Sequence, residues 1–374
     1  MGERHGIALN VTTDLRYFQA ISACGQDGTV MTSLAELLPT PPSMAEVKAA
    51  FVQAMLEEFQ LELQIGVETP QEQALERRAR PSWLRVKAPG SPDFLTTREI
   101  VREHKLVTVC EEARCPNMGE CWSHHTATFM IMGELCTRRC SFCSVKDGTL
   151  NTLSPLDAFE PLRAAQAVQR LGLHHVVITS VNRDDLPDMG AAHFDQTARA
   201  IRKLNPDCEI EFLIPDMRGK RHLVETILQS GFVKVLNHNV ETVPRLYREV
   251  RPGAVFQRSL DILRWAKELS PHTRTKSGLM VGLGERREEV LAVMDALRES
   301  NVEVLTIGQY LQPTSKQLPI QRYVTPEEFA EYREEGRKRG FLHVESGPLV
   351  RSSYHAWQHT GEATPAASPV SPAA

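Results

Sequence analysis

Short apolar runs rich in β-branched residues alternate with amphipathic segments through the middle of the chain. The runs predict buried strands, and apolar residues three or four apart in the intervening segments predict helices that pack on them. Phe194, Ala198, Ile201 and Leu204 form one such helical stripe. Six strands are predicted, at residues 126–133, 175–181, 209–216, 233–241, 275–283 and 302–311.

The residues at the ends of the predicted helices agree with this alternation. Thr325, followed by Pro326 and then by Glu328, is typical of a helix start, because threonine and glutamate can satisfy the unpaired backbone N–H groups there. Glycines stand where three helices are expected to end, at Gly172, Gly231 and Gly340.

Six consecutive strand-helix units require parallel strands with right-handed crossovers, in either a doubly wound sheet or a full or partial barrel. In both folds, chemistry takes place at the carboxyl ends of the strands. Polar residues gather at these predicted ends: Thr179, Ser180, Asn182, Arg183, Asp184, Asp185, Asp216, Arg218, Asn237, His238, Asn239, Glu241, Gln309 and Gln312.

The two ends of the chain differ from its middle. Residues 1–75 are predicted to be a partly disordered extension with one amphipathic helix, whose apolar stripe is Val47, Phe51, Met55 and Phe59. Docking of this helix on the main domain is favoured over binding of a partner. Met31 is an alternative start, and residues 361–374, rich in Pro, Ala and Ser, are expected to be disordered.

Composition and charge narrow the class of protein. The 374 residues are 41% hydrophobic and 24% charged, with a net charge of -4, which is typical of a globular protein and gives no sign of nucleic-acid binding. The sequence has neither a long apolar run that could span a membrane nor a recognisable targeting segment at its start. We therefore expect a cytoplasmic protein.

Six of the eight cysteines lie in two triplets, C-x4-C-x5-C at 110–121 and C-x3-C-x2-C at 136–143. In a reducing compartment such clusters indicate metal ligands or redox groups rather than disulfides. The second triplet follows the first predicted strand, so it should open onto the active face. The other two cysteines, Cys24 and Cys208, are interpreted as ordinary small apolar residues.

Three kinds of metal site compete for these triplets. Zinc usually takes four Cys or His ligands, and His124 or His125 could complete a triplet. An electron carrier would hold an iron-sulfur cluster with four cysteines. A [4Fe-4S] cluster held by only three thiolates leaves one iron open to a small molecule, which would explain why each triplet has three.

The second triplet, "CTRRCSFC", resembles the signature of the radical S-adenosylmethionine (SAM) enzymes. The resemblance implies that Cys136, Cys140 and Cys143 hold a [4Fe-4S] cluster whose open iron binds SAM. One electron from the cluster would then release a 5'-deoxyadenosyl radical. Phe142 is placed either to contact the adenine or to pack the loop.

The surrounding motifs resemble one family within this class, the lipoyl synthases. They are "SWLRVKAPGSPDF", "TVCEEARCPNMGECW", "TSVNRDDLPD", "EFLIPDMRG", "NHNVETVPRLYREVRPGA", "TKSGLMVGLGE", "TIGQYLQPT" and "GPLVRSSYHA". The resemblance implies an auxiliary [4Fe-4S] cluster on Cys110, Cys115 and Cys121, with Ser353 as fourth ligand and Ser352 as the alternative. This cluster would be consumed as the sulfur donor.

The reaction implied is insertion of sulfur at C6 and C8 of an octanoyl group on a protein lysine. The implied partners are octanoylated lipoyl carrier domains, namely the acyltransferase subunits of 2-oxoacid dehydrogenases and the glycine cleavage H protein. An electron donor such as ferredoxin or flavodoxin and iron-sulfur carrier proteins are also implied. A hydrophobic channel should lie between the clusters.

The expected architecture is a partial (β/α)6 TIM-type barrel at residues 126–345, with N- and C-terminal extensions covering its open face. The auxiliary-cluster segment is placed at 76–125 and the C-terminal ligand segment at 346–360. Contacts to SAM are expected from Thr179, Asn182 and Asp184, in addition to Phe142. Weaker candidates are His238 and Asn239, and Arg351 would orient the serine loop or pair with a carboxylate.

Two positions depart from the family pattern. Met189 replaces a usual glycine, so the loop after the second strand is expected to turn differently, and Gln317 replaces a usual histidine in a substrate loop. The alternatives are another radical SAM sulfur-inserting enzyme, either a methylthiotransferase or a biotin-synthase-like protein, and a zinc-stabilised interaction protein. A methylthiotransferase should carry a basic RNA-binding module, whereas this chain ends in a neutral tail.

Overall fold

The computed structural model describes residues 9–16, 31–59, 81–86, 90–123, 127–149, 151–354 and 356. Cys24, His124, His125 and the predicted tail at 361–374 lie outside the described residues. The chain divides into two compact units, Met1–Glu76 and Arg77–Ala374. Among the described helices, none is both long and apolar enough to cross a membrane.

The first unit contains the predicted amphipathic helix. Helix α2 (Met44–Glu58) begins at Ser43, whose hydroxyl accepts from Glu46 N at 3.3 Å while the Glu46 carboxylate accepts from Ser43 N at 2.7 Å. A short helix, α1 (Leu34–Leu37), precedes it and was not predicted. This capping box fixes the start of α2.

The second unit is built on one long sheet with strand order β1-β2-β5-β6-β7-β8-β9-β10. From β2 to β10 every pairing is parallel, and only the edge strand β1 is antiparallel. Because the strands are ordered as in the chain, the fold is a barrel-type array rather than a doubly wound sheet. Among the described residues β1 and β10 are not paired, so the predicted partial barrel is confirmed.

All six predicted strands are present. They are β2 (Thr128–Ile131), β5 (His175–Ser180), β6 (Glu209–Leu213), β7 (Val233–Asn237), β8 (Arg274–Val281) and β9 (Val304–Gln309). The sequence did not predict β1 (Val107–Thr108), β10 (His343–Gly347), or the small sheet of β3 (Leu135–Cys136) and β4 (Lys146–Asp147). Strand β10 was missed because it has one large apolar residue, Val344, and lies in register with β9 through its backbone.

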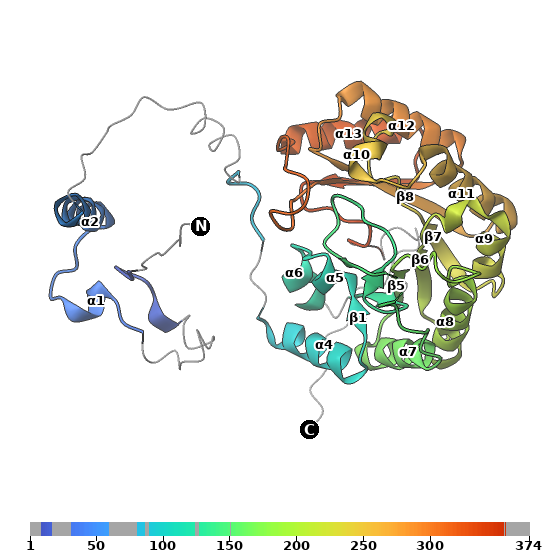
Figure 1. Ribbon diagram of the computed structural model, residues 1–374, viewed down its shortest axis with the longest axis horizontal. Coiled ribbons are helices and arrows are strands. Elements are labelled where there is room, and N and C mark those ends of the chain that lie inside the picture. Colours follow the sequence, from blue (N-terminus) through green and yellow to red (C-terminus); the bar gives the residue numbers. More distant parts are fainter. Residues whose placement is uncertain are drawn as a thin grey trace. The chain divides into compact units, whose positions relative to one another are not determined.

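Helices surround the outer face of the sheet (Figure 1). The main ones are α7 (Glu160–Leu171), α8 (Ala191–Leu204), α9 (Arg221–Leu228), α11 (Phe256–Leu269), α12 (Arg287–Glu299) and α13 (Pro326–Lys338). Each packs an apolar stripe on the strands, as α8 does with Phe194, Ala198 and Ile201, which are fully buried. The predicted ends are confirmed where Thr325 caps α13 and where Gly172 ends α7 at φ 62°.

In the second unit, helices α4 (Pro92–Glu103), α5 (Val109–Glu112) and α6 (Met118–Ser123) precede β2 in the chain, and α10 (Tyr247–Val250) follows β7. Trp122 of α6 is fully buried and stacks on Phe94 of α4, with ring centroids 5.2 Å apart. Thr97 Oγ1 donates to Trp122 O at 2.9 Å, which joins the same two helices. These contacts fix the segment that carries the first cysteine triplet.

Candidate functional site

A cavity of about 930 Å³ opens at the carboxyl ends of the strands. Both triplets contribute to its wall, through Cys110 and Cys115 of the first and through Cys136, Cys140 and Cys143 of the second. The expectation that the cysteines open onto the face at the strand ends is therefore confirmed. Cys208 lies away from this wall and is buried in the core.

The second triplet lies on a loop that starts at β3 and is attached to the end of β5. Thr137 N and its hydroxyl both donate to Asn182 O at 3.0 Å. Cys136 Sγ accepts from the backbone N–H groups of Arg138 and Asn182, each at 3.4 Å. These two contacts attach the Cys136 side chain to its own loop and to the segment that follows β5.

The rest of this loop is attached to two further connections of the barrel. Ser141 N donates to Val250 O at 3.0 Å, and Leu318 N donates to Ser141 O at 3.1 Å. Gln317 Nε2 donates to Cys143 O at 3.1 Å. The cysteine loop is thus held by the segments that follow β5, β7 and β9.

Burial raises the pKa of Cys140 to about 11 and that of Cys143 to about 12. Charge interactions within the triplet raise the pKa values in the same direction, from Cys136 on Cys140 and from both of these thiols on Cys143. A buried thiol ionises when a metal replaces its proton, so these groups suit metal ligation rather than free thiolate chemistry.

The first triplet lies on α5 and α6. Cys115 N donates to Cys110 O at 2.9 Å and so closes the turn after α5. Burial raises the pKa values of Cys110 and Cys121 to about 12, and charge interactions with the other thiols of the triplet act in the same direction. Ser144 Oγ donates to Glu112 O at 2.6 Å and links this segment to the one that follows the second triplet.

The C-terminal segment, residues 349–354, reaches the side of the cavity that carries the first triplet. Ser353 Oγ accepts from Thr128 Oγ1 at 2.8 Å. Thr128 begins β2, and its backbone N–H lowers the pKa of Cys110, so it lies beside that thiol. Ser352 and Ser353 both line the cavity, but this contact with Thr128 is made by Ser353.

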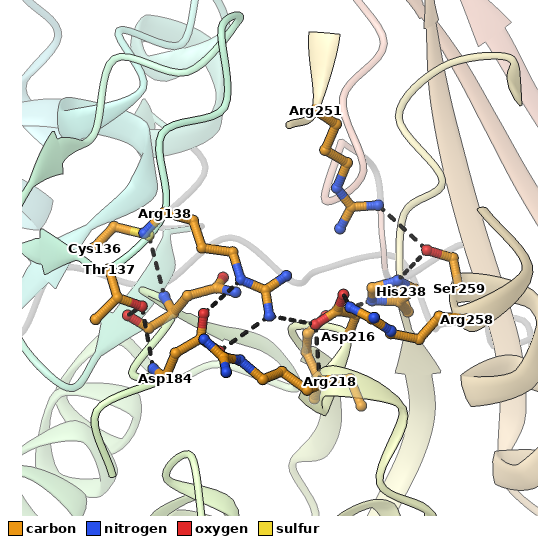
Figure 2. Close-up of polar contacts among 12 residues, drawn as sticks. Cys136, Thr137, Arg138, Asp184, Asp216, Arg218, His238, Arg251, Arg258 and Ser259 are labelled. Atoms are coloured by element: carbon orange, nitrogen blue, oxygen red, sulfur yellow. Dashed lines mark hydrogen bonds and ion pairs between the residues drawn. The ribbon is translucent and has the colours of Figure 1, made fainter. Parts of the chain in front are cut away.

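Arg138, which lies between the first two cysteines of the second triplet, is at the centre of a group of charged side chains (Figure 2). Arg138 forms ion pairs of 2.7 Å with both Asp184 and Asp216. Arg218 and Arg258 approach the same two carboxylates, at 3.3 and 3.0 Å. Although burial opposes ionisation, the hydrogen bonds from Arg138 lower the pKa of each carboxyl, so both stay ionised.

The structure separates the residues that were expected to contact SAM. Phe142, Thr179 and Asn182 line the cavity, although the Thr179 hydroxyl donates to Leu213 O at 3.0 Å. The carboxylate of Asp184 instead pairs with Arg138, and Asp184 is not among the residues that form the wall.

His238 and Asn239 also line the cavity, but His238 is only 1% exposed. Its Nδ1 donates to Ile214 O at 2.8 Å, and its Nε2 lies 2.9 Å from Ser259 Oγ. Burial and the nearby Arg251 lower its pKa to about 4, so it is neutral near pH 7. These contacts and its burial favour a structural role for His238 over a contact with SAM.

Three residues of the wall were not expected to matter from the sequence. Arg251 donates to Asn239 O at 2.8 Å beneath the second triplet, and its charge lowers the pKa of Cys140. Thr128 positions Ser353, as described above. Glu241 was noted only as a polar strand end, yet it lies at φ 65°, and its charge raises the pKa of Cys140. Nothing in the sequence around Arg251 indicates that this loop arginine lies at the cavity wall.

The two departures from the family pattern have visible consequences. Met189 itself lies at φ 52°, the left-handed conformation that favours glycine, and is 6% exposed. The loop after β5 therefore keeps a turn of the kind that favours glycine, with Met189 in the left-handed conformation. Gln317 contacts the cysteine loop through Cys143 O, as given above.

Within the described part of the chain, no three His, Cys, Asp or Glu side chains converge as ligands of a single metal ion.

The chain is similar to known proteins over most of its length. The model of the radical SAM superfamily matches residues 130–297. A lipoyl synthase from Rubrobacter xylanophilus is 55% identical over 287 residues, 77% of this chain and 88% of that protein. A lipoyl synthase from Chloroflexus aurantiacus is 51% identical over 300 residues, 80% of this chain and 97% of that protein. Among solved structures, a methylornithine synthase covers 77% of this chain and 85% of its own, with 13% identity and a TM-score of 0.45.

Proposed function

The chain belongs to the lipoyl synthase family, and we propose that its two cysteine triplets hold two [4Fe-4S] clusters for radical SAM sulfur insertion. The product is the lipoyl group, formed by sulfur insertion at C6 and C8 of an octanoyl chain on a protein lysine. The observation that supports this assignment of residues is that two cysteines of the first triplet, all three of the second, and Ser353 line one cavity.

Cys136, Cys140 and Cys143 would hold the cluster that binds SAM. Three thiolates leave one iron open, and when both groups are bound the cluster supplies the electron that cleaves SAM to a 5'-deoxyadenosyl radical. The protein's part is to keep the sulfurs in place, which the backbone contacts at Cys136 and Cys143 support, and to keep water away from the radical.

Contacts to SAM are proposed for Phe142, Thr179 and Asn182, which line the cavity next to this triplet. For Asp184 we propose an indirect role instead. Its carboxylate holds Arg138, which lies between the first two cysteines of the loop, so Asp184 would fix the loop rather than touch the cofactor.

The auxiliary cluster would be held by Cys110, Cys115, Cys121 and Ser353. The contact from Thr128 to Ser353 Oγ supports this serine over Ser352, because Thr128 also lies beside Cys110. An alkoxide is a hard ligand on an iron that usually prefers thiolate, so this bond should be the easier one to give up. A releasable ligand suits a cluster that supplies sulfur.

The substrate is proposed to enter the cavity as an octanoyl-lysine of a lipoyl carrier domain. Apolar side chains between the two triplets support an acyl channel, among them Met130, Ile214, Leu279, Met280, Leu311 and Leu349. The carriers proposed are the acyltransferase subunits of 2-oxoacid dehydrogenases and the glycine cleavage H protein. A ferredoxin or flavodoxin would donate electrons in the cytoplasm, and iron-sulfur carrier proteins would supply the clusters.

Anaerobic reconstitution followed by turnover with an octanoyl-lysine peptide tests this function. We expect about eight irons per chain, and mass spectrometry should show a peptide that has gained two sulfurs as a dithiol, with the loss of two hydrogens after the dithiol is oxidised to the disulfide. One zinc per chain with no iron, or an unmodified peptide in the presence of both clusters, would contradict the proposal.

A further inference from the structure

The C-terminal segment is tied to the first triplet on both sides of Ser353. Before the serine, Asn117 Nδ2 donates to Leu349 O at 2.6 Å. After it, the Tyr354 hydroxyl donates to the two carboxylate oxygens of Glu120 at 3.3 and 3.4 Å. The proposed ligand therefore lies between two points of attachment.

Both attachments come from the residues between the second and third cysteines of the first triplet. The Asn117 side chain belongs to a residue that is 3% exposed, so its amide would be left without a partner if the segment moved away. Glu120 and Tyr354 are half-buried, so water can take the place of their contact. The two attachments thus differ in how easily they open.

An oxygen ligand has to stay within bonding distance of its iron, and ordering a chain segment is costly. Fixing the backbone of each residue costs conformational entropy. Hydrogen bonds that order the segment beforehand remove this cost from the coordination step. Partners of this kind, outside the ligands themselves, commonly orient the ligands of metal sites.

We propose that Asn117 and Glu120 are positioning residues that hold Ser353 against the first triplet, Glu120 acting through the Tyr354 hydroxyl. This inference rests on the proposed function, because it takes Ser353 as the fourth ligand of the auxiliary cluster. Asn117 is the firm attachment and Glu120 the one that opens when the serine is released.

Three variants test the weaker attachment. Tyr354→Phe and Glu120→Ala each remove the same contact, whereas Glu120→Gln keeps an acceptor for the hydroxyl. In the apo-protein, hydrogen exchange of the C-terminal segment should be about tenfold faster in the first two variants. The double variant should add little to either single change, and Glu120→Gln should restore most of the protection.

The second readout is Mössbauer spectroscopy of protein reconstituted with ⁵⁷Fe. The oxygen-ligated iron of the auxiliary cluster should lose occupancy in Tyr354→Phe and Glu120→Ala, while total iron and cleavage of SAM stay at the wild-type level. Asn117→Ala should lower this occupancy further. Glu99→Ala, which removes an exposed carboxylate from α4, is the matched control and should change neither readout.

Unchanged exchange and an unchanged oxygen-ligated iron in Tyr354→Phe and Glu120→Ala would overturn the inference. That outcome differs from failure of the proposed function, which would appear in the wild-type protein as the absence of a second cluster or of its oxygen-ligated iron. If Asn117→Ala fails to fold, the tyrosine and glutamate variants still decide the matter.

Discussion

The two cysteine triplets are held by different parts of the protein. The loop at 136–143 is bonded to the segments that follow β5, β7 and β9, so three separate connections of the barrel fix it. The first triplet lies on the short helices α5 and α6, and the C-terminal segment closes its remaining side.

This difference matches the different roles proposed for the clusters. A loop bonded to several barrel connections keeps its geometry as long as the barrel is folded, because opening it would break contacts with several core elements at once. The C-terminal segment is attached to the side of the first triplet by hydrogen bonds of single side chains, those of Asn117, Thr128 and Tyr354, and such a segment can open locally at a smaller free-energy cost. The persistent cluster would therefore sit on the rigid side and the consumed one on the side that can open.

The largest expected effects come from removing one cysteine of each triplet. Cys140→Ala should abolish formation of 5'-deoxyadenosine, because it dismantles the site that binds SAM. Cys115→Ala should still cleave SAM but insert no sulfur. Chromatography of 5'-deoxyadenosine together with mass spectrometry of the peptide separates the two losses.

Cys208→Ala is the control for this pair, since Cys208 is buried in the core away from the cavity. It should keep both activities. If Cys115→Ala still formed lipoyl product, the sulfur donor would not be the first triplet's cluster, and the comparison between the two sites would fail.

A second prediction concerns the rigid side of the comparison. Arg138→Met should destabilise the apo-protein by about 3 kcal/mol, because it removes the ion pairs with Asp184 and the fully buried Asp216, although these keep Arg218 and Arg258 as partners. Urea unfolding measures this change. The neighbouring Arg139→Met is the matched control: Arg139 is 72% exposed, and its loss should alter stability by no more than about 0.5 kcal/mol. Equal effects of the two substitutions would mean that the ion pairs do not fix the loop.

The barrel could be predicted from the sequence because its strands and helices are recorded in local apolar patterns. All six strands at 126–311 obey this rule, and so does the capped start of α13 at Thr325. Strand β10 does not, because its pairing with β9 uses the backbone and requires little from its side chains. An edge strand of mixed polarity looks like a loop in the sequence.

The site was predictable to the extent that its chemistry is local. The cysteine spacings indicated two groups of metal ligands, whereas the proposal for Ser353 came only from resemblance to a family, since a lone serine carries no signal. The contacts of Asn117 and Glu120 join residues 232 and 234 positions apart, and nothing near either residue records them. Likewise, the ion pair of Asp184 with Arg138 joins residues 46 positions apart, and nothing near either residue indicates it.

A third prediction uses acid to probe the rigid side. The pKa of His238 is lowered from 6.5 to about 4 by burial, so the unfolded chain binds a proton here between pH 6.5 and pH 4 while the folded chain does not. The stability is therefore complete above pH 6.5 and is lost as the pH falls. From pH 7 to pH 5 the loss should be about 2 kcal/mol.

Urea midpoints of the apo-protein at the two pH values measure this loss. In His238→Gln the part of the pH dependence that belongs to this histidine should disappear. His222→Gln, at an exposed position of α9, should leave the dependence as it is in the wild type. An unchanged dependence in His238→Gln would show that the histidine is charged or exposed, contrary to its contacts with Ile214 and Ser259.

The smallest effect is expected at Gln317, one of several attachments of the second triplet. Gln317→Ala removes the hydrogen bond to Cys143 O and should cost about 1 kcal/mol, with hydrogen exchange in the cysteine loop about fivefold faster. Because the bonds through Ser141 remain, iron content and SAM cleavage should be kept. Loss of the first cluster in this variant would mean that the loop depends on a single contact. The second triplet would then no longer differ from the C-terminal segment, where the Tyr354 hydroxyl is predicted to help hold Ser353 in place.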